Sequence, residues 1–185
     1  MPRIQPVSLD QAPEAAKLML EGLNNKLGRV PNIFKTMAIA PSVLELYMGA
    51  SGAVAKSSLP ASLREQIALA CAGATGCDYC ASAHSVIGKG AGLTDAQTSA
   101  ALHGRADEAR AQAAMTFARD LIAHPQHVDD AQVTALRQAG FNDAQILEIV
   151  AVISLNLFTN FFNHVADTTC DFEPFVSTKD VAKAA

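Results

Sequence analysis

The sequence has no tryptophan, few other aromatic residues and no run of basic side chains. Of its 185 residues 5% are aromatic, and 18 acidic residues outnumber 14 basic ones. A protein that binds nucleic acid neutralises phosphates with a positively charged face. Because no segment supplies such a face, we expect no nucleic-acid partner.

Long uninterrupted hydrophobic runs are also absent. Met1–Asp10 has no apolar core of the kind that a secretory signal requires. The most apolar stretch, Ile146–Phe162, is interrupted by Ser154, Asn156 and Asn160. It falls short of the roughly 20 apolar residues that cross a bilayer. We therefore expect a cytoplasmic protein with no membrane partner.

Half of the residues are hydrophobic, which is enough for a core that needs no disulfide or structural metal. Alanine is abundant, and no stretch alternates with period two for long enough to form a strand. The composition therefore predicts an all-α protein. We expect one domain over residues 1–185, with an N-terminal helical extension at 1–58 and a core at 59–170.

Proline, glycine and helix-capping residues divide the chain into helical segments. The heptapeptide at 91–97 resembles the one at 139–145, and each has a glycine followed by Thr94 or Asn142 at an expected N-cap. Two interpretations stay open: the same favourable helix–turn–helix structure occurs twice, or a helical unit has been duplicated. The expected helices cover residues 12–27, 31–39, 42–56, 61–74, 77–89, 95–102, 107–124, 130–139 and 143–167.

The last expected helix carries an asparagine stripe. Asn156, Asn160 and Asn163 follow at steps of four and three, so they share one face, and His164 is four residues after Asn160. Buried amides need partners. We favour a hydrogen-bonded seam within the core or between subunits; the alternative is a polar stripe that approaches reactive thiols.

The most informative segment contains two of the four cysteines, Cys77 and Cys80. With His84 they occupy positions i, i+3 and i+7, which lie on one face of a helix. Gly73 and Gly76 bracket an expected turn between two antiparallel helices. If those helices form a hairpin, Glu65 lies level with His84. The sequence thus predicts a central hairpin that gathers two thiols, an imidazole and a carboxylate.

This set has a chemical logic. A cysteine at the start of a helix is stabilised as the thiolate, its reactive form. His84 can accept a thiol proton, and Glu65 can orient the imidazole. The Cys-x-x-Cys spacing permits a disulfide, and a thiol oxidised by peroxide to a sulfenic acid can condense with its neighbour. We interpret Cys71 as a buried apolar residue and Cys170 as structural or exposed.

A zinc site is the alternative for the same side chains. Cys77, Cys80 and His84 supply three ligands, and a catalytic zinc needs no more than three from the protein. No second Cys-x-x-Cys or His-x-x-x-His follows in the sequence. A zinc-binding or regulatory helical module therefore remains open, although we expect no bound metal or cofactor.

Glu65, Cys77-Asp78-Tyr79-Cys80, Ala83-His84 and Gly92 together resemble the core motif of the AhpD-like alkylhydroperoxidases, within the carboxymuconolactone decarboxylase superfamily. The segment Leu27–Asn32 resembles the peroxidase-related branch. The best-studied members have histidine before the second cysteine, where this chain has Tyr79.

The resemblance implies an AhpD-like helical bundle that assembles as a homo-oligomer, commonly a trimer or hexamer. It also implies a thiol-dependent peroxidase that acts on a hydroperoxide and is re-reduced by a dithiol or a redox protein. Cys80 would be the peroxidatic thiol, Cys77 the resolving thiol, and His84 with Glu65 the proton relay. Superfamily analogy adds a lactone or decarboxylase-type enzyme as a further alternative.

Overall fold

The computed structural model describes residues 1–179 and 181, and within them all regular structure is helical. This confirms the all-α prediction, and every expected helix is present with both ends within two residues of the expected ones. The helices are α1 (Glu14–Leu27), α2 (Asn32–Met37), α3 (Pro41–Val54), α4 (Ala61–Thr75), α5 (Asp78–Gly90), α6 (Asp95–Leu102), α7 (Ala109–Ala123), α8 (Asp130–Gln138) and α9 (Asp143–Ala166).

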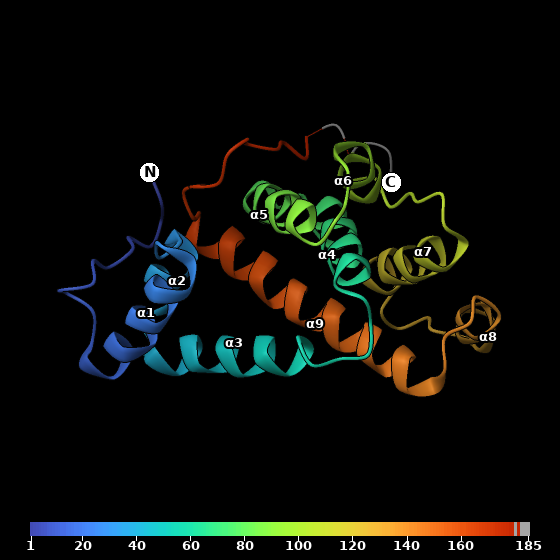
Figure 1. The fold of residues 1–185 in the computed structure, drawn as a ribbon, viewed down its shortest axis with the longest axis horizontal. Coiled ribbons are helices and arrows are strands. Elements are labelled where there is room, and N and C mark those ends of the chain that lie inside the picture. The colour runs from blue at the N-terminus through green and yellow to red at the C-terminus, as the bar shows by residue number, and fades with distance from the viewer. Residues whose placement is uncertain (180, 182–185) are drawn as a thin grey trace.

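Helix α4 is the central element. It packs against α5, α6, α7 and α9, and α9 runs diagonally through the molecule between the α4–α5 pair and α3 (Figure 1). Helices α1 and α2 lie near the C-terminal end of α9, and α7 and α8 lie toward its N-terminal end. Helix α3 runs along one side of α9. Helix α4 has many buried small side chains, among them Ala68, Ala70 and Ala72, which allow it to pack closely on several sides.

The turn of the α4–α5 hairpin is shorter than the sequence predicted. Gly76 has a φ of 71° and ends α4, whereas Gly73 lies inside that helix. Gly73 is required for a different reason. A Cβ at this position would collide with the backbone carbonyl of Leu102 in α6. The expectation that Gly73 begins the turn was therefore wrong, because contact with α6 and not turn geometry demands the glycine.

The repeated segments at 91–97 and 139–145 have the predicted local structure. Thr94 caps α6 and Asn142 caps α9, each in a reciprocal capping box with the glutamine three residues later. The glycines that precede them, Gly92 and Gly140, both have positive φ. The caps explain why both helices begin where they do.

The segment after α9 returns across the hairpin and passes over α5 (Figure 1). The backbone N–H of Thr178 donates to Oδ1 of Asp78 at 2.7 Å, and its hydroxyl donates to the same oxygen at 2.6 Å. The N–H of Val176 donates to Oγ of Ser82 at 2.8 Å. The first turn of α5, which follows Cys77, is therefore tied to residues near the end of the chain.

Helix α9 extends well beyond the apolar stretch noted in the sequence. By length and mean hydropathy, 1.6 over its most apolar 18 residues, it would also suffice to cross a membrane. The core helix of a soluble protein meets the same criterion. It packs against α3, α4, α5, α7 and α8, and 39% of that 18-residue window is buried inside the structure.

Candidate active site

The two motif cysteines lie at the start of α5, as predicted. Cys77 is the N-cap, and its Sγ accepts a hydrogen bond from the backbone N–H of Cys80 at 3.4 Å. Both residues are almost fully buried, with 2% and 3% of their surfaces exposed, and both are free thiols. The helix N-terminus therefore contributes a donor to a sulfur that caps it.

The hairpin brings Glu65 of α4 level with His84 of α5. Oε2 of Glu65 lies 2.7 Å from Nδ1 of His84, and the side chains are 17% and 20% exposed. This confirms the register that the sequence predicted. A Cβ at Gly88, one turn after His84, would lie 3.1 Å from Cδ1 of Leu93 but at an ordinary contact distance, 3.6 Å, from Cβ of Glu65, so this glycine makes room for Leu93.

The carboxylate changes the acidity of the imidazole. Burial by itself lowers the pKa of His84, but the charge of Glu65 and its hydrogen bond more than offset this, so the pKa is raised above its ordinary value. The thiol of Cys77 contributes in the same direction when ionised. His84 is thus prepared to hold a proton near the sulfurs.

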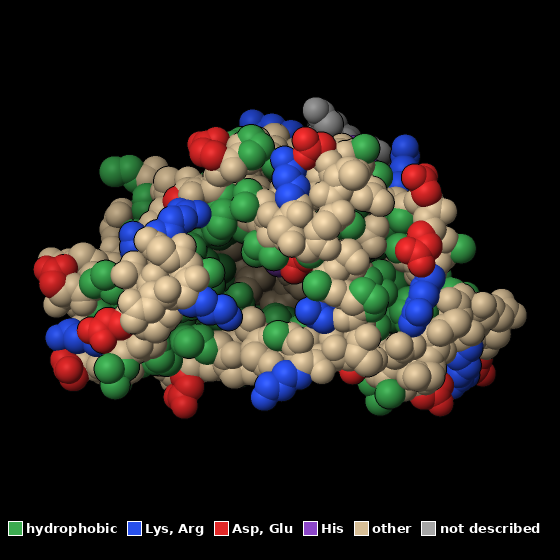
Figure 2. All heavy atoms as spheres, viewed as in Figure 1, with side chains coloured by type: hydrophobic (Ala, Val, Ile, Leu, Met, Phe, Trp, Pro, Cys, Tyr) green, Lys and Arg blue, Asp and Glu red, His purple; other side chains and the backbone are tan. Residues whose placement is uncertain are grey.

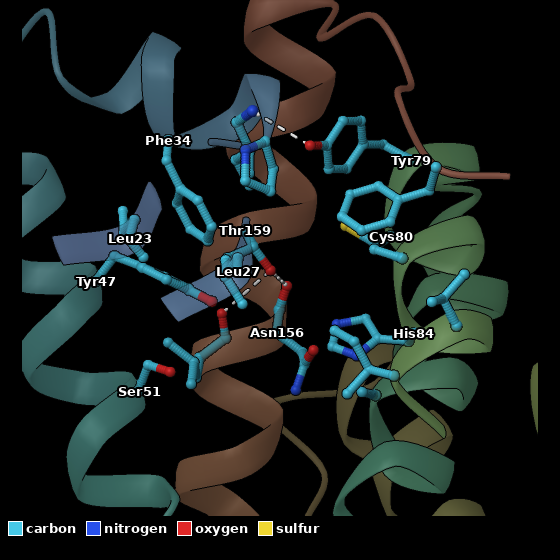
Figure 3. Close-up of a pocket in the computed structure, with 18 of the residues that line it drawn as sticks. Leu23, Leu27, Phe34, Tyr47, Ser51, Tyr79, Cys80, His84, Asn156 and Thr159 are labelled. Carbon is cyan, nitrogen blue, oxygen red and sulfur yellow. Dashed lines mark hydrogen bonds between the residues drawn. The ribbon is translucent and has the colours of Figure 1, made fainter. Parts of the chain in front are cut away.

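A cavity of about 760 Å³ opens beside this group. Figure 2 shows the hollow in the face of the molecule, and Figure 3 shows Phe34 and Tyr47 across from Cys80 and His84. Its wall is mostly apolar, and the Phe34 and Tyr47 rings lie with centroids 5.2 Å apart. Glu65 also lines it. Of the four cysteines, all among the described residues, Cys80 alone reaches this wall.

The two thiols differ in acidity. Hydrogen bonds from the side chain and then the backbone N–H of Cys80 lower the pKa of Cys77 despite its burial, and His84 adds to this effect. The pKa of Cys80 is raised well above its ordinary value by the Cys77 sulfur and by burial. The pair therefore holds its first negative charge mainly on Cys77, with the Cys80 thiol hydrogen-bonded beside it.

Tyr79, which replaces the histidine of the best-studied family members, faces away from the sulfurs. Its hydroxyl donates to Oδ1 of Asp171 at 2.9 Å and accepts the backbone N–H of Ile33 at 3.2 Å. Its ring meets Phe172 edge-on at 5.5 Å. Burial raises the pKa of the phenol, and Asp171 adds to that. Tyr79 therefore links α5 to α2 and to the C-terminal segment.

The asparagine stripe of α9 combines both readings made from the sequence. Nδ2 of Asn160 donates to Oγ1 of Thr75 at 2.8 Å, and Nδ2 of Asn156 donates to the carbonyl of Val152 at 2.8 Å. These are bonds within the core. Nδ2 of Asn163, in contrast, donates to Sγ of Cys80 at 3.2 Å.

The contact of Asn163 with the thiol was the less favoured prediction. The helical spacing of the asparagines was the signal that found their shared face. The positions of Phe34 and Tyr47 on the cavity wall carried no such signal in the sequence. They depend on how α3 packs against α9 and how α2 packs against α3.

The remaining cysteines lie outside the site. Cys71 is fully buried, and burial raises its pKa to about 12. Cys170 is half-buried in the C-terminal segment. Among residues 1–179 and 181, no group of three or more histidine, cysteine or acidic side chains is arranged to hold a metal ion. The zinc alternative therefore gains no support from the geometry.

Residues 41–123 match the carboxymuconolactone decarboxylase family. No curated protein matches the chain. An uncharacterized peroxidase-related protein from Ralstonia eutropha JMP134, described as an alkylhydroperoxidase AhpD core, has a similar structure with a TM-score of 0.86 and 24% identity over 96% of both chains.

Two further solved structures are similar. An uncharacterized peroxidase-related protein from Silicibacter sp. TM1040 has a TM-score of 0.82 and 22% identity, covering 96% of this chain and 97% of that one. A cysteine-to-alanine variant of the debrominase Bmp8, in complex with 2,3,4-tribromopyrrole, has a TM-score of 0.77 and 23% identity, covering 98% and 96%. These solved structures share the helical fold of this chain.

Proposed function

We propose that this chain is an AhpD-like member of the carboxymuconolactone decarboxylase superfamily and acts as a thiol-dependent peroxidase, which the family match over residues 41–123 and the shared fold support. One observation carries the proposal. Cys80 reaches a large apolar cavity beside the Glu65–His84 pair, and Cys77 lies one helical turn behind it. The apolar wall favours an organic hydroperoxide over hydrogen peroxide.

The proposed reaction uses the dithiol as a two-electron donor. The thiol of Cys80 transfers its proton toward the Cys77 thiolate beside His84. Sγ of Cys80 then attacks the terminal oxygen of the hydroperoxide. The S–O bond forms as the O–O bond breaks, and the alkoxide leaves as the alcohol with a proton from His84. Cys77 then attacks the sulfenic sulfur, which forms the disulfide and releases water.

The acidity of the pair supports this order of events. The first charge is held mainly on Cys77, which has the backbone N–H and His84 beside it. Cys80 is the sulfur that a substrate in the cavity meets. A proton moving from Cys80 toward Cys77 moves the charge onto the attacking sulfur without bringing a new charge into the buried site.

Thiol counting tests the proposal. Wild-type protein mixed with one equivalent of cumene hydroperoxide should lose two thiols, mapped to Cys77 and Cys80. Cys80→Ser should lose none, and it should consume no hydroperoxide with dithiothreitol. Cys170→Ser is the matched control, because this thiol does not reach the cavity, and it should behave as wild type. Unchanged consumption in Cys80→Ser would contradict the mechanism.

A second candidate is reductive dehalogenation of an aromatic compound. It is supported by the aromatic rings of Phe34 and Tyr47 on the cavity wall and by the fold shared with the debrominase. The same dithiol would supply two electrons, so that a carbon–halogen bond becomes a carbon–hydrogen bond, halide leaves and the disulfide forms. Bromide release from a polybrominated pyrrole with dithiothreitol, faster than hydroperoxide turnover, would favour this candidate.

The cycle also needs a reductant and a reducing environment. We propose a dithiol or a redox protein as reductant and a cytoplasmic location, because thiols remain reduced there. We further propose a homo-oligomer, a trimer or hexamer, in which the outer face of α9 takes part. Leu147, Phe161 and Val165 are 71%, 57% and 65% exposed on this helix. Light scattering that shows only a 19.4 kDa particle would contradict assembly.

A further inference from the structure

Tyr47 faces the thiols from the opposite wall of the cavity. It is half-buried on α3, whereas Cys80 and His84 lie on α5, and Figure 3 shows its hydroxyl at the end of a ring that points into the cavity. In a mostly apolar pocket a few polar groups fix the orientation of a ligand. The Tyr47 hydroxyl is therefore placed where a bound molecule meets it.

The O–H of Tyr47 has no acceptor among residues 1–179 and 181. Ser51, one turn later on the same helix, favours the ionised form of the phenol, which is the effect of a donor. The phenol oxygen is not among the fully buried polar atoms without a partner, in contrast to Oδ1 of Asn160 and Asn163. It therefore keeps accessible surface, and its proton is free to bond a ligand.

The phenol of Tyr47 is kept neutral by its surroundings. Burial raises its pKa, the Ser51 hydroxyl offsets part of this, and the charges of Glu65 and Cys80 raise the pKa further. The effect of these two charges also indicates that the phenol lies near the reacting groups. A neutral phenol is a hydrogen-bond donor, and a donor in a site shielded from water stabilises negative charge that develops beside it.

Tyr79, the only other tyrosine in the sequence, provides the comparison. Its hydroxyl donates to Oδ1 of Asp171 at 2.9 Å and accepts the backbone N–H of Ile33 at 3.2 Å. That hydroxyl is already bonded within the protein. Of the two tyrosines, Tyr47 therefore has the O–H that a substrate can use.

We propose that Tyr47 is a catalytic residue that donates a hydrogen bond to the leaving oxygen of the hydroperoxide. This role rests on the proposed peroxidase function. A sulfur that displaces an alkoxide attacks in line with the O–O bond, so the leaving oxygen lies on the side away from Sγ of Cys80. The wall on that side of the cavity carries Tyr47 (Figure 3).

The donor fits the proposed reaction without changing its balance. The S–O bond forms, the O–O bond breaks, and the electron pair of that bond stays on the leaving oxygen as an alkoxide. Tyr47 keeps its proton and stabilises the charge, while His84 supplies the proton that converts the alkoxide into the alcohol. A donor matters most where charge is concentrated on one oxygen. Alkyl hydroperoxides, which release alkoxides, should therefore depend on Tyr47 more than peroxy acids, which release carboxylates.

The first measurement is the rate of thiol oxidation by cumene hydroperoxide and by perbenzoic acid, two aromatic oxidants of similar size. Tyr47→Phe keeps the ring and removes the hydroxyl. It should slow the hydroperoxide reaction by about a hundredfold, the size expected for one donor to a developing oxyanion, and the peroxy acid reaction by less than about tenfold. Equal losses for the two oxidants, or no loss, would overturn the role at the leaving oxygen.

Tyr79→Phe is the matched control, because it makes the same change at a hydroxyl that is bonded within the protein. Both rates per folded molecule should stay within about twofold of wild type. A loss in Tyr79→Phe equal to that in Tyr47→Phe would mean that the effect is structural and would overturn the proposal.

The second measurement is a binding titration that needs no peroxide. The alcohol 2-phenyl-2-propanol and the hydrocarbon tert-butylbenzene have similar shapes, but only the alcohol accepts a hydrogen bond. In calorimetric titrations of reduced protein, Tyr47→Phe should bind the alcohol about tenfold more weakly than wild type and the hydrocarbon equally well. Equal affinity of the two proteins for the alcohol would overturn the hydrogen bond.

The two measurements separate the role of Tyr47 from the proposed function. If wild-type protein reacts with no hydroperoxide, the peroxidase proposal fails, and the binding titration still decides whether Tyr47 donates to an oxygen in the cavity. If wild type and Tyr47→Phe react equally fast, the peroxidase stands and the role of Tyr47 fails. Circular dichroism confirms folding, and Ser51→Ala, which removes the neighbouring donor, serves if Tyr47→Phe does not fold. It should slow the hydroperoxide reaction more than the peroxy acid reaction, and equal rates would overturn the proposal.

Discussion

Oε2 of Glu65 lies 2.7 Å from Nδ1 of His84, and this contact joins the two helices of the hairpin. A neutral amide of the same shape could also join the two helices at this position. The particular effect of the carboxylate is to raise the pKa of the imidazole. Changing Glu65 to glutamine therefore removes the charge and keeps the shape.

Glu65→Gln is predicted to slow peroxide-dependent thiol oxidation by about a hundredfold, which is within the range contributed by general acid–base groups. His84 would lose the partner that favours its protonated form, so fewer molecules would hold the proton needed by the leaving alkoxide. Stopped-flow measurement of thiol loss tests this. Glu148→Gln, the same change at a carboxylate that bonds Ser58 and does not line the cavity, is the control and should retain the rate.

The same pair makes stability depend on pH. The pKa of His84 is raised on folding, so the pair stabilises the protein fully below the ordinary histidine pKa of about 6.5. That contribution is lost as pH rises through the higher folded value. Urea unfolding at several pH values should show wild type losing stability across this window and Glu65→Gln losing less. Equal pH dependence in the two proteins would contradict the link.

Cys77→Ser is predicted to stop the cycle at the sulfenic acid. Cys80 still faces the cavity and reacts, but no neighbouring thiol remains to form the disulfide. Labelling with dimedone followed by mass spectrometry should show an adduct on Cys80 in this variant and little in wild type. An adduct at another cysteine, with none on Cys80, would assign the attacking role elsewhere.

Tyr79→Phe is predicted to affect stability and to leave thiol chemistry intact. The change removes the hydroxyl that joins Asp171 to the backbone of Ile33, and we expect a loss of about 1–3 kcal/mol in the free energy of unfolding. The rate of thiol oxidation per folded molecule should stay within about twofold of wild type, because hydrogen bonding directs this phenol away from the sulfurs. A rate loss as large as that of Glu65→Gln would mean that Tyr79 takes part in proton transfer.

Cys71 is predicted to be inert in the folded protein. Its pKa of about 12 leaves almost no thiolate at neutral pH, and its surface is fully buried. Iodoacetamide at neutral pH should leave Cys71 unmodified until guanidinium unfolds the chain. Modification in the native protein at the rate of Cys170 would show that the core opens around α4.

The helices and the hairpin were predictable because they depend on local signals. Pro60 and Gly76 mark the ends of α4, and a rigid helix on each side of a short turn sets the level of Glu65 against His84. The start of the turn was predicted at Gly73, which is wrong because this glycine is required by its close contact with Leu102, 29 residues away in the sequence. A contact of that kind cannot be inferred from spacing along the chain.

Contacts across greater sequence distances were the least predictable part of the site. The bond from Asn163 to Cys80 depends on where α9 crosses α5, and the use of Tyr79 depends on Asp171 in the C-terminal segment. Neither position is encoded in a local motif. The division into an extension at 1–58 and a core at 59–170 remains a prediction.

The bond between Asp78 and Thr178 joins residues that are 100 positions apart. A ribosome that has just produced the motif must therefore add most of the second half of the protein before Asp78 meets this partner. A nascent or truncated chain that stops before Val176 leaves Asp78 and Ser82 without three hydrogen bonds, two to Asp78 from Thr178 and one to Ser82 from Val176. The first turn of the active-site helix thus completes these hydrogen bonds only after residues 176–178 have been synthesised.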